Sequence, residues 1–290
     1  MTSPAWRSLT SEELERQYSP SAWVRRVAPS EVVRQFVEAL TAQSQRARRS
    51  LPCDLGLRYG PGPEQRYNVL GTDVPDNAPL AVFIHGGFWQ MMDLDSSDGV
   101  ALGFRQLDWR TATVGYDLAP AVSLEQIERQ ALALRQRSRA LLLFGHSAGA
   151  QLAAAMLADW STLPAAQRPL VGAAVYVSGV FDLEPLLSTT VNAALRLDAA
   201  GARRHSPLRQ CATLAALPEF RHVVLVGEHD SPEFVRQTRE FAAGLRQAGC
   251  RAVDHVVAGR DHFDVCEALA DAGSDVMKVV QQQLADVLAV

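Results

Sequence analysis

From residue 55 onward, short apolar runs alternate with longer helical stretches. The apolar runs, rich in Val, Leu and Ala, are typical of buried strands and lie at residues 80–85, 111–116, 140–144, 171–177, 222–226 and 252–257. Helical stretches lie between several of them, at residues 124–138, 148–158 and 232–248. Strands that alternate with helices form parallel sheets covered on both faces. The pattern predicts an α/β fold with a mostly parallel central sheet and helices on both faces.

The first fifty residues show a helical pattern and lack the strand-like apolar runs. Residues 10–49 read as helical, with Ser11 expected to cap a first helix and Ser30 to start a second. In the second helix apolar residues recur at helical spacing, at Val32, Val33, Phe36, Val37 and Leu40. We expect one domain spanning residues 1–290, with the helical segment 1–50 packing on it or capping it.

Composition narrows the class of protein. The formal net charge is −4, so no strong field favours nucleic acid or an anionic membrane. The four cysteines are widely spaced without a C-x-x-C pair, which argues against a zinc knuckle or a disulfide scaffold and favours a reducing cytoplasm. The N-terminus lacks the apolar region of a signal peptide, and no apolar run is long enough to span a membrane. We expect a cytoplasmic protein with a small-molecule partner; a homodimer is left open.

The run at 140–144 leads into Gly145-His146-Ser147-Ala148-Gly149 and then into an alanine-rich stretch. This is G-x-S-x-G between a strand and a helix, the context in which a serine nucleophile sits on a sharp, strained turn. The turn is too tight for side chains at the flanking positions, which explains the glycines. The alternative is a glycine-rich turn without chemistry. The pattern predicts Ser147 as a nucleophile.

The run at 80–85 ends in His85-Gly86-Gly87-Phe88-Trp89. Acyl transfer develops negative charge on the carbonyl oxygen, and backbone N–H groups stabilise it; losing one donor typically costs about 3 kcal/mol. We expect the N–H groups of Gly86, Gly87 and Ala148 to form this oxyanion hole. A plain glycine turn at a strand end is the alternative. His85 is expected to fix the loop and not to carry a proton.

The acid and the base follow the nucleophile in the chain order Ser, acid, His. Asp230 follows the run at 222–226 and is the expected acid, with Glu228 as its rival. His262 follows the last run and is the expected base, whereas His255 lies within that run and should point into the sheet. Asp182 follows an earlier run and comes too early for the usual acid.

These three residues predict a serine hydrolase. A serine hydroxyl is a poor nucleophile until a neutral imidazole accepts its proton, and a buried carboxylate fixes the imidazole. A metallohydrolase is disfavoured because H-E-x-x-H is absent, and a dinucleotide enzyme because G-x-G-x-x-G is absent. No metal and no cofactor are expected. A non-catalytic binding protein on this scaffold is the remaining alternative from another class.

The same residues carry a family resemblance. The sequence resembles the kynurenine formamidases (arylformamidases) of the α/β-hydrolase superfamily, whose signature H-G-G-x-W stands at 85–89. Further similar segments are YSPSAWV (18–24), GHSAGAQLAA (145–154), ADW (158–160), VSGVFDLEP (177–185), SP (206–207), DSPEF (230–234) and DHF (261–263). The acid at Asp117 departs from the family pattern.

The resemblance implies hydrolysis of N-formyl-L-kynurenine to kynurenine and formate, in tryptophan breakdown, by Ser147, Asp230 and His262 without a cofactor. A broad carboxylesterase or aryl-amidase with the same machinery is the alternative. A formyl group has only hydrogen on its carbon, so the acyl pocket can be small. Aromatic residues would line the side of the site that holds the aryl leaving group. Candidates are Phe88 and Trp89, followed by Tyr18 and Trp23 on a turn-like stretch where both are expected to be exposed; core packing is the alternative for each.

Overall fold

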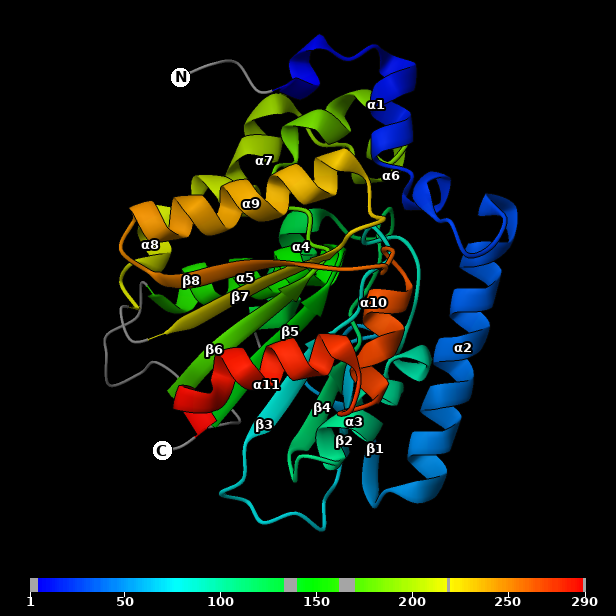
Figure 1. Ribbon diagram of the computed structural model, residues 1–290, viewed down its shortest axis with the longest axis vertical. Helices are drawn as coiled ribbons and strands as arrows, with labels where there is room; N and C mark the ends of the chain where they lie inside the picture. Colours follow the sequence, from blue (N-terminus) through cyan, green and yellow to red (C-terminus); the bar gives the residue numbers. More distant parts are fainter. Residues whose placement is uncertain (1–4, 133–139, 162–169, 218–219, 289–290) are drawn as a thin grey trace.

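The computed structural model describes residues 5–132, 140–161, 170–217 and 220–288, and within them eight strands form one sheet (Figure 1). The strands are β1 (Cys53–Arg58), β2 (Arg66–Leu70), β3 (Leu80–Ile84), β4 (Arg110–Val114), β5 (Ala140–His146), β6 (Leu170–Val177), β7 (Arg221–Gly227) and β8 (Arg251–Val257). Their order is β1-β2-β4-β3-β5-β6-β7-β8. The β1–β2 and β2–β4 pairs are antiparallel and all other neighbours are parallel. The predicted fold class is confirmed.

Helices cover both faces of this sheet. They are α1 (Ser11–Gln17), α2 (Pro29–Ser50), α3 (Ala101–Arg105), α4 (Leu124–Leu132), α5 (Ala148–Ser161), α6 (Asn192–Leu195), α7 (Ala199–Arg204), α8 (Cys211–Leu214), α9 (Pro232–Gln247), α10 (Asp264–Glu267) and α11 (Asp275–Leu288). Helices α4, α5 and α9 lie on one face, and α3 and α11 lie on the other with the inner side of α2 (Figure 1). The rest of the predicted helix 124–138 lies outside the described residues. None of the helices in the described ranges is long and apolar enough to cross a membrane.

The buried strands contribute side chains to two hydrophobic cores, one on each face of the sheet. In β3, Val82 and Ile84 enter the core beneath α5, whereas Ala81 and Phe83 enter the core beneath α11. The same alternation holds along β7. Because successive side chains point to opposite faces and both faces are covered, these strands need apolar residues at every position. This is why their sequence signal is a continuous apolar run.

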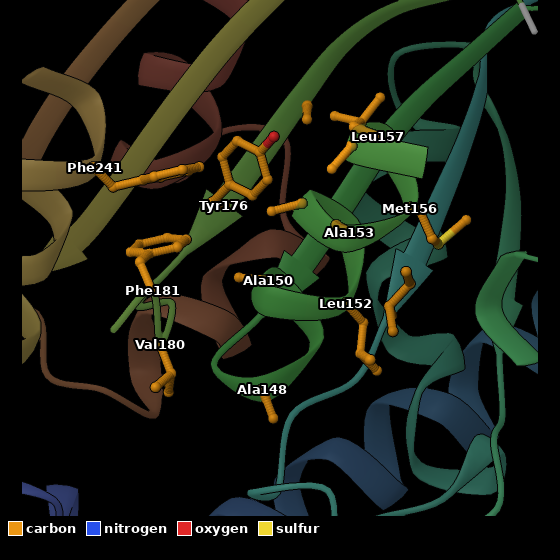
Figure 2. Close-up of a cluster of buried hydrophobic side chains, with 14 of the residues drawn as sticks. Ala148, Ala150, Leu152, Ala153, Met156, Leu157, Tyr176, Val180, Phe181 and Phe241 are labelled. Carbon is orange, nitrogen blue, oxygen red and sulfur yellow. The ribbon is translucent and has the colours of Figure 1, made fainter. Parts of the chain in front are cut away.

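Helix α5 approaches the sheet closely because much of its surface is alanine. Figure 2 shows these small side chains beside a group of aromatic rings. The rings of Phe181 and Phe241 stack with centroids 4.3 Å apart, and Tyr176 meets Phe241 edge-on at 5.5 Å. Residues along α5 are almost all buried. This packing fixes the start of α5, and with it the turn that precedes the helix.

The structure differs from the sequence-based expectation at the two edges of the sheet. Strands β1 and β2 were not anticipated, because β1 is exposed along nearly all of its length and β2 carries polar residues, so neither forms an apolar run. At the opposite edge, His255 is exposed and does not point into the sheet. The edge strands are β1 and β8, and each has one unpaired side. Strand β2 is paired on both sides but only partly buried, so it too can carry polar residues.

The helix starts near the N-terminus also differ from expectation. Thr10, and not Ser11, caps α1: its side chain accepts the Glu13 N–H, and the Glu13 carboxylate accepts the Thr10 N–H at 2.8 Å. Helix α2 begins at Pro29 and has no side-chain cap. Proline suits a first helical position because the N–H it lacks would have no partner there. The expected exposure of Tyr18 is also wrong, because this residue is buried.

A buried carboxylate ties α2 to the sheet. Asp98 is fully buried and accepts hydrogen bonds from Arg48 Nε at 2.6 Å, from Asn68 Nδ2 at 2.9 Å, and from the Thr113 hydroxyl. These donors come from α2, β2 and β4. Removing one member of a buried ion pair leaves the other desolvated and uncompensated.

We expect Asp98→Ala to destabilise the fold by about 3–5 kcal/mol, measured by urea unfolding, because Arg48 and Asn68 lose their buried acceptor. Asp95→Ala is the matched control: Asp95 also pairs with Arg48, but its side chain is 80% exposed. This change should cost less than about 1 kcal/mol. Equal effects of the two variants would contradict the role assigned to Asp98.

Candidate active site

The predicted catalytic residues lie at one edge of the sheet. Gly86 follows β3, Ser147 follows β5, Asp230 follows β7 and His262 follows β8. Because these strands are parallel, their carboxyl ends meet at the same edge. A cavity of about 130 Å³ lies there, and Ser147, His262, Gly86 and Gly87 all line it. Residues more than 170 positions apart in the chain therefore share one small space.

Ser147 sits on a strained turn between β5 and α5. Its φ is +54°, in the left-handed region, and its N–H donates to the Val177 carbonyl at 2.9 Å. A Cβ at Gly145 would lie 2.3 Å from the Gly149 carbonyl oxygen, and a Cβ at Gly149 would lie 2.1 Å from the Ile84 oxygen. Only glycine fits at either position. Left-handed backbone in a non-glycine residue costs about 1–3 kcal/mol and persists only where its surroundings enforce it.

His262 is held by Asp230. Its Nδ1 donates to Asp230 Oδ2 at 2.8 Å, and both side chains are buried. The second carboxylate oxygen accepts the Ser231 N–H at 2.8 Å. The rival acid, Glu228, is half-exposed and accepts the Gly259 N–H instead. With the proton on Nδ1, the lone pair of a neutral His262 lies on Nε2, where a base needs it.

Ser147 and His262 face the same cavity without a direct bond. Among the contacts of the described residues, no hydrogen bond joins Ser147 Oγ to the imidazole of His262. Catalytic hydrogen bonds are often long before substrate binds and tighten in the complex.

The glycine loop lies against Ser147. A Cβ at Gly86 would be 2.9 Å from Ser147 Cβ, and Gly87 has φ +100° with its Cα pressed towards the Met91 carbonyl. Within the described part of the chain, the N–H groups of Gly86, Gly87 and Ala148 have no hydrogen-bond acceptor. Three N–H donors near Ser147 are thus without an acceptor among the described residues.

His85 fixes this loop, in line with expectation. Its Nδ1 donates to the Gly86 carbonyl at 2.8 Å, and its ring stacks on Tyr116. Burial lowers the pKa of His85 to about 4, so the imidazole is neutral near pH 7. A neutral, buried ring suits a structural role.

His146, between Gly145 and Ser147, has a role that sequence reasoning missed. Its Nε2 donates to the backbone carbonyl of His262 at 2.8 Å. Burial, and then the neighbouring His262, lowers the pKa of His146 to about 3. The side chain therefore joins the turn at Ser147 to the loop that carries His262, as a neutral donor. No sequence signal marks this contact, because its partner is a backbone atom 116 positions away.

Of the four aromatic residues proposed to bind substrate, only Phe88 lines the cavity. Trp89 is fully buried, and its Nε1 donates to Gln151 Oε1 at 3.1 Å. Tyr18 is buried against α9, where its hydroxyl donates to Glu233 at 3.2 Å. Trp23 borders a separate hollow on the outer side of Asp230. Core and surface packing account for these three side chains.

Part of the cavity wall that sequence reasoning missed comes from α2. Val33, Phe36 and Leu40 of this helix line the cavity, together with Met91, Met92 and Phe263. Their helical spacing was visible in the sequence, but the partner surface was not. No charged side chain of the described residues lines the cavity.

Asp117 has a structural role. Asp117, the departure from the family pattern, accepts the Glu64 N–H at 2.9 Å and hydrogen bonds from Gln65 and Gln130 at 3.0 Å each. It therefore holds the loop after β4 against the one before β2.

Among the described residues, no group of three or more His, Cys, Asp or Glu side chains could hold a metal ion.

Comparison with known proteins extends the similarity beyond the motifs. A family model for the alpha/beta hydrolase fold matches residues 81–264. The kynurenine formamidase of Danio rerio is 34% identical over 289 residues, covering 96% of this chain and 98% of the relative. That of Drosophila melanogaster is 31% identical, covering 93% and 96%. A solved structure assigned as a thioesterase from Silicibacter sp. TM1040 has a TM-score of 0.78 at 28% identity, covering 93% of this chain and 99% of its own.

The buried histidines make stability depend on pH. Burial lowers the pKa of His222 to about 3, as it lowers those of His85 and His146, from a usual value of 6.5. Between about pH 6.5 and 4 the unfolded chain binds these protons and the folded chain does not, so stability falls as pH falls. Each histidine contributes up to about 1.4 kcal/mol per pH unit.

We expect His222→Gln to make the dependence of the unfolding free energy on pH shallower by about one proton across this range, measured by urea unfolding at several pH values. An unchanged slope would contradict this.

Proposed function

Because the chain belongs to the kynurenine formamidase family of α/β-hydrolases, we propose that it hydrolyses N-formyl-L-kynurenine to L-kynurenine and formate. The observation that carries this proposal is one arrangement: His262, hydrogen-bonded to Asp230, lines the same cavity as Ser147 and the Gly86–Gly87 peptides. That arrangement supports acyl transfer through a serine.

In the first half of the reaction, Ser147 Oγ attacks the formyl carbon while its proton passes to His262 Nε2. The carbonyl oxygen becomes an oxyanion and accepts hydrogen bonds from the N–H groups of Gly86, Gly87 and Ala148. The imidazolium is stabilised by Asp230. The carbon–nitrogen bond then breaks, His262 gives its proton to the leaving arylamine, and a formyl ester remains on Ser147.

In the second half, water attacks the formyl ester and gives a proton to His262. The ester bond breaks, His262 returns the proton to Ser147 Oγ, and formic acid leaves and loses its proton to solvent as formate. No step draws on a metal or an organic cofactor.

The lining of the cavity supports an aryl substrate. Its walls are mostly apolar and partly aromatic, at Phe36, Phe88 and Phe263, and none of the described residues that line it is Asp, Glu, Lys or Arg. An aromatic ring gains free energy from burial here, whereas the ammonium and carboxylate groups of kynurenine would be desolvated without a partner. In this proposal the charged end of the substrate stays outside the cavity.

The same observation favours a second candidate, a carboxylesterase or aryl-amidase of broad specificity. Moving an uncharged ester from water into this cavity costs less desolvation free energy than moving a zwitterion does. The chemistry at Ser147 is unchanged, so only the substrate distinguishes the two candidates.

We also propose that residues 1–290 act as a single domain, with α2 supplying part of the cavity wall. A cytoplasmic location fits the four free cysteines. The substrate in this proposal is a small molecule.

The nucleophile is tested first. We expect Ser147→Ala to lower kcat by about 10⁶-fold, because the hydroxyl is the attacking group. Circular dichroism and thermal unfolding show whether the variant is folded. Near-normal turnover by folded Ser147→Ala protein would refute the proposed mechanism.

The substrate is tested by comparing kcat/KM for N-formyl-L-kynurenine with that for short-chain p-nitrophenyl esters. We expect the formamide to be hydrolysed with the higher value. An ester preference of several orders of magnitude would overturn the formamidase proposal in favour of the carboxylesterase. Loss of both activities in Ser147→Ala assigns them to the same site.

A further inference from the structure

Two peptide groups of the glycine loop share one hydrogen-bond donor, the hydroxyl of Tyr116. This oxygen lies 2.9 Å from the His85 carbonyl oxygen and 3.3 Å from the Gly86 carbonyl oxygen. Tyr116 follows β4 and is 1% exposed. Burial raises the pKa of its hydroxyl well above the usual value, so the group keeps its proton. The donor is therefore present throughout the working pH range.

The direction of these carbonyls fixes the direction of two N–H groups. In a trans peptide, the C=O and the N–H of one planar unit point in opposite directions. The His85 carbonyl belongs to the same peptide as the Gly86 N–H, and the Gly86 carbonyl to the same peptide as the Gly87 N–H. Because both carbonyls turn towards Tyr116, both N–H groups turn away from it. These are two of the three donors assigned to the oxyanion.

The loop needs such a restraint. Beyond Gly87, at φ +100°, Phe88 and Trp89 also have positive φ, at +49° and +60°. Backbone of this kind is retained only where the surroundings over-determine it. The far end is held by Trp89 Nε1 on Gln151, and the near end by His85 Nδ1 on the Gly86 carbonyl, 2.8 Å away. The His85 ring in turn stacks on Tyr116 with centroids 4.3 Å apart.

We propose that Tyr116 is a positioning residue for the reaction, whose hydroxyl aims the Gly86 and Gly87 N–H groups at the developing oxyanion. It touches neither substrate nor reacting atoms, and it is absent from the cavity lining. The proposal rests on the acyl-transfer function proposed above. The competing view is that Tyr116 only fills the core and satisfies two carbonyls.

The structure offers a matched control for this test. Tyr176 is also a fully buried tyrosine, and its hydroxyl makes one hydrogen bond, to His222 Nδ1 at 3.1 Å. It lies on β6, away from the cavity lining. Tyr116→Phe and Tyr176→Phe each remove one buried oxygen and nothing else. A purely structural role predicts that both variants lose stability and neither loses turnover.

We expect Tyr116→Phe to lower kcat about tenfold with KM nearly unchanged, less than the loss of a whole oxyanion donor, because the N–H groups remain but are less well aimed. Tyr176→Phe should keep the kcat of the wild type. Thermal unfolding of both variants confirms that folded proteins are compared.

A second readout isolates the oxyanion. An aryl trifluoromethyl ketone adds to Ser147 and places a negative oxygen where the transition state has one. Its inhibition constant should rise in Tyr116→Phe by about the factor by which kcat/KM falls, and stay unchanged in Tyr176→Phe. His85→Asn, which keeps an N–H donor near Nδ1, should retain more activity than His85→Leu. This pair tests the second bond on the Gly86 carbonyl without changing Tyr116.

The outcomes separate the two proposals. If the wild type hydrolyses neither formamide nor ester, the proposed function fails. If the wild type is active while Tyr116→Phe matches it in kcat and in ketone affinity, the positioning role is overturned and the proposed function stands. Equal losses of kcat in Tyr116→Phe and Tyr176→Phe would also overturn the positioning role.

Discussion

The close contact between β3, β5 and the start of α5 is the constraint on which the candidate site depends. The Gly149 backbone packs so tightly against Ile84 that no side chain fits between them. This contact places Ser147 in left-handed backbone next to Gly86, at the end of the neighbouring parallel strand. Given that fixed point, the loops after β7 and β8 need only reach the same edge of the sheet to complete the constellation. The two glycines and the alanines of α5 therefore permit the close approach that places Ser147 beside Gly86.

Backbone carbonyls organise much of the rest. His146 holds the carbonyl of His262, His85 holds that of Gly86, and Tyr116 holds those of His85 and Gly86. Each donor is buried, and the two histidines are neutral near pH 7 because burial lowers the pKa of each. The candidate site thus has a layer of uncharged donors behind the proposed catalytic groups. Preorganised dipoles of this kind need no rearrangement when charge develops in the reaction.

Sequence reasoning succeeded where the physical demand is local. A strand buried on both faces needs a continuous apolar run, so the six parallel-sheet strands from β3 to β8 were predicted within one or two residues. The G-x-S-x-G and H-G-G segments were readable because tight turns and close backbone approach require glycine. Asp230 and His262 followed from chain order, and the structure joins them by a hydrogen bond.

It failed where the determinant is a distant partner. Trp89 was expected to line the substrate pocket, but its indole is buried in the core and donates a hydrogen bond to Gln151. Tyr18 was expected to be exposed but is buried against α9, and part of the cavity wall comes from α2 instead. The edge strand β1 and its neighbour β2 carry no apolar run because β1 is exposed along most of its length and β2 is only partly buried. None of these contacts has a local signature in the chain.

The most direct measurement of the central claim is to react the protein with an aryl organophosphonate and locate the adduct by peptide mass spectrometry. A working triad predicts one phosphonyl group per chain, on Ser147, with protection by substrate. The absence of any adduct, or an adduct on another residue, would contradict the assignment of Ser147, His262 and Asp230 as a catalytic triad.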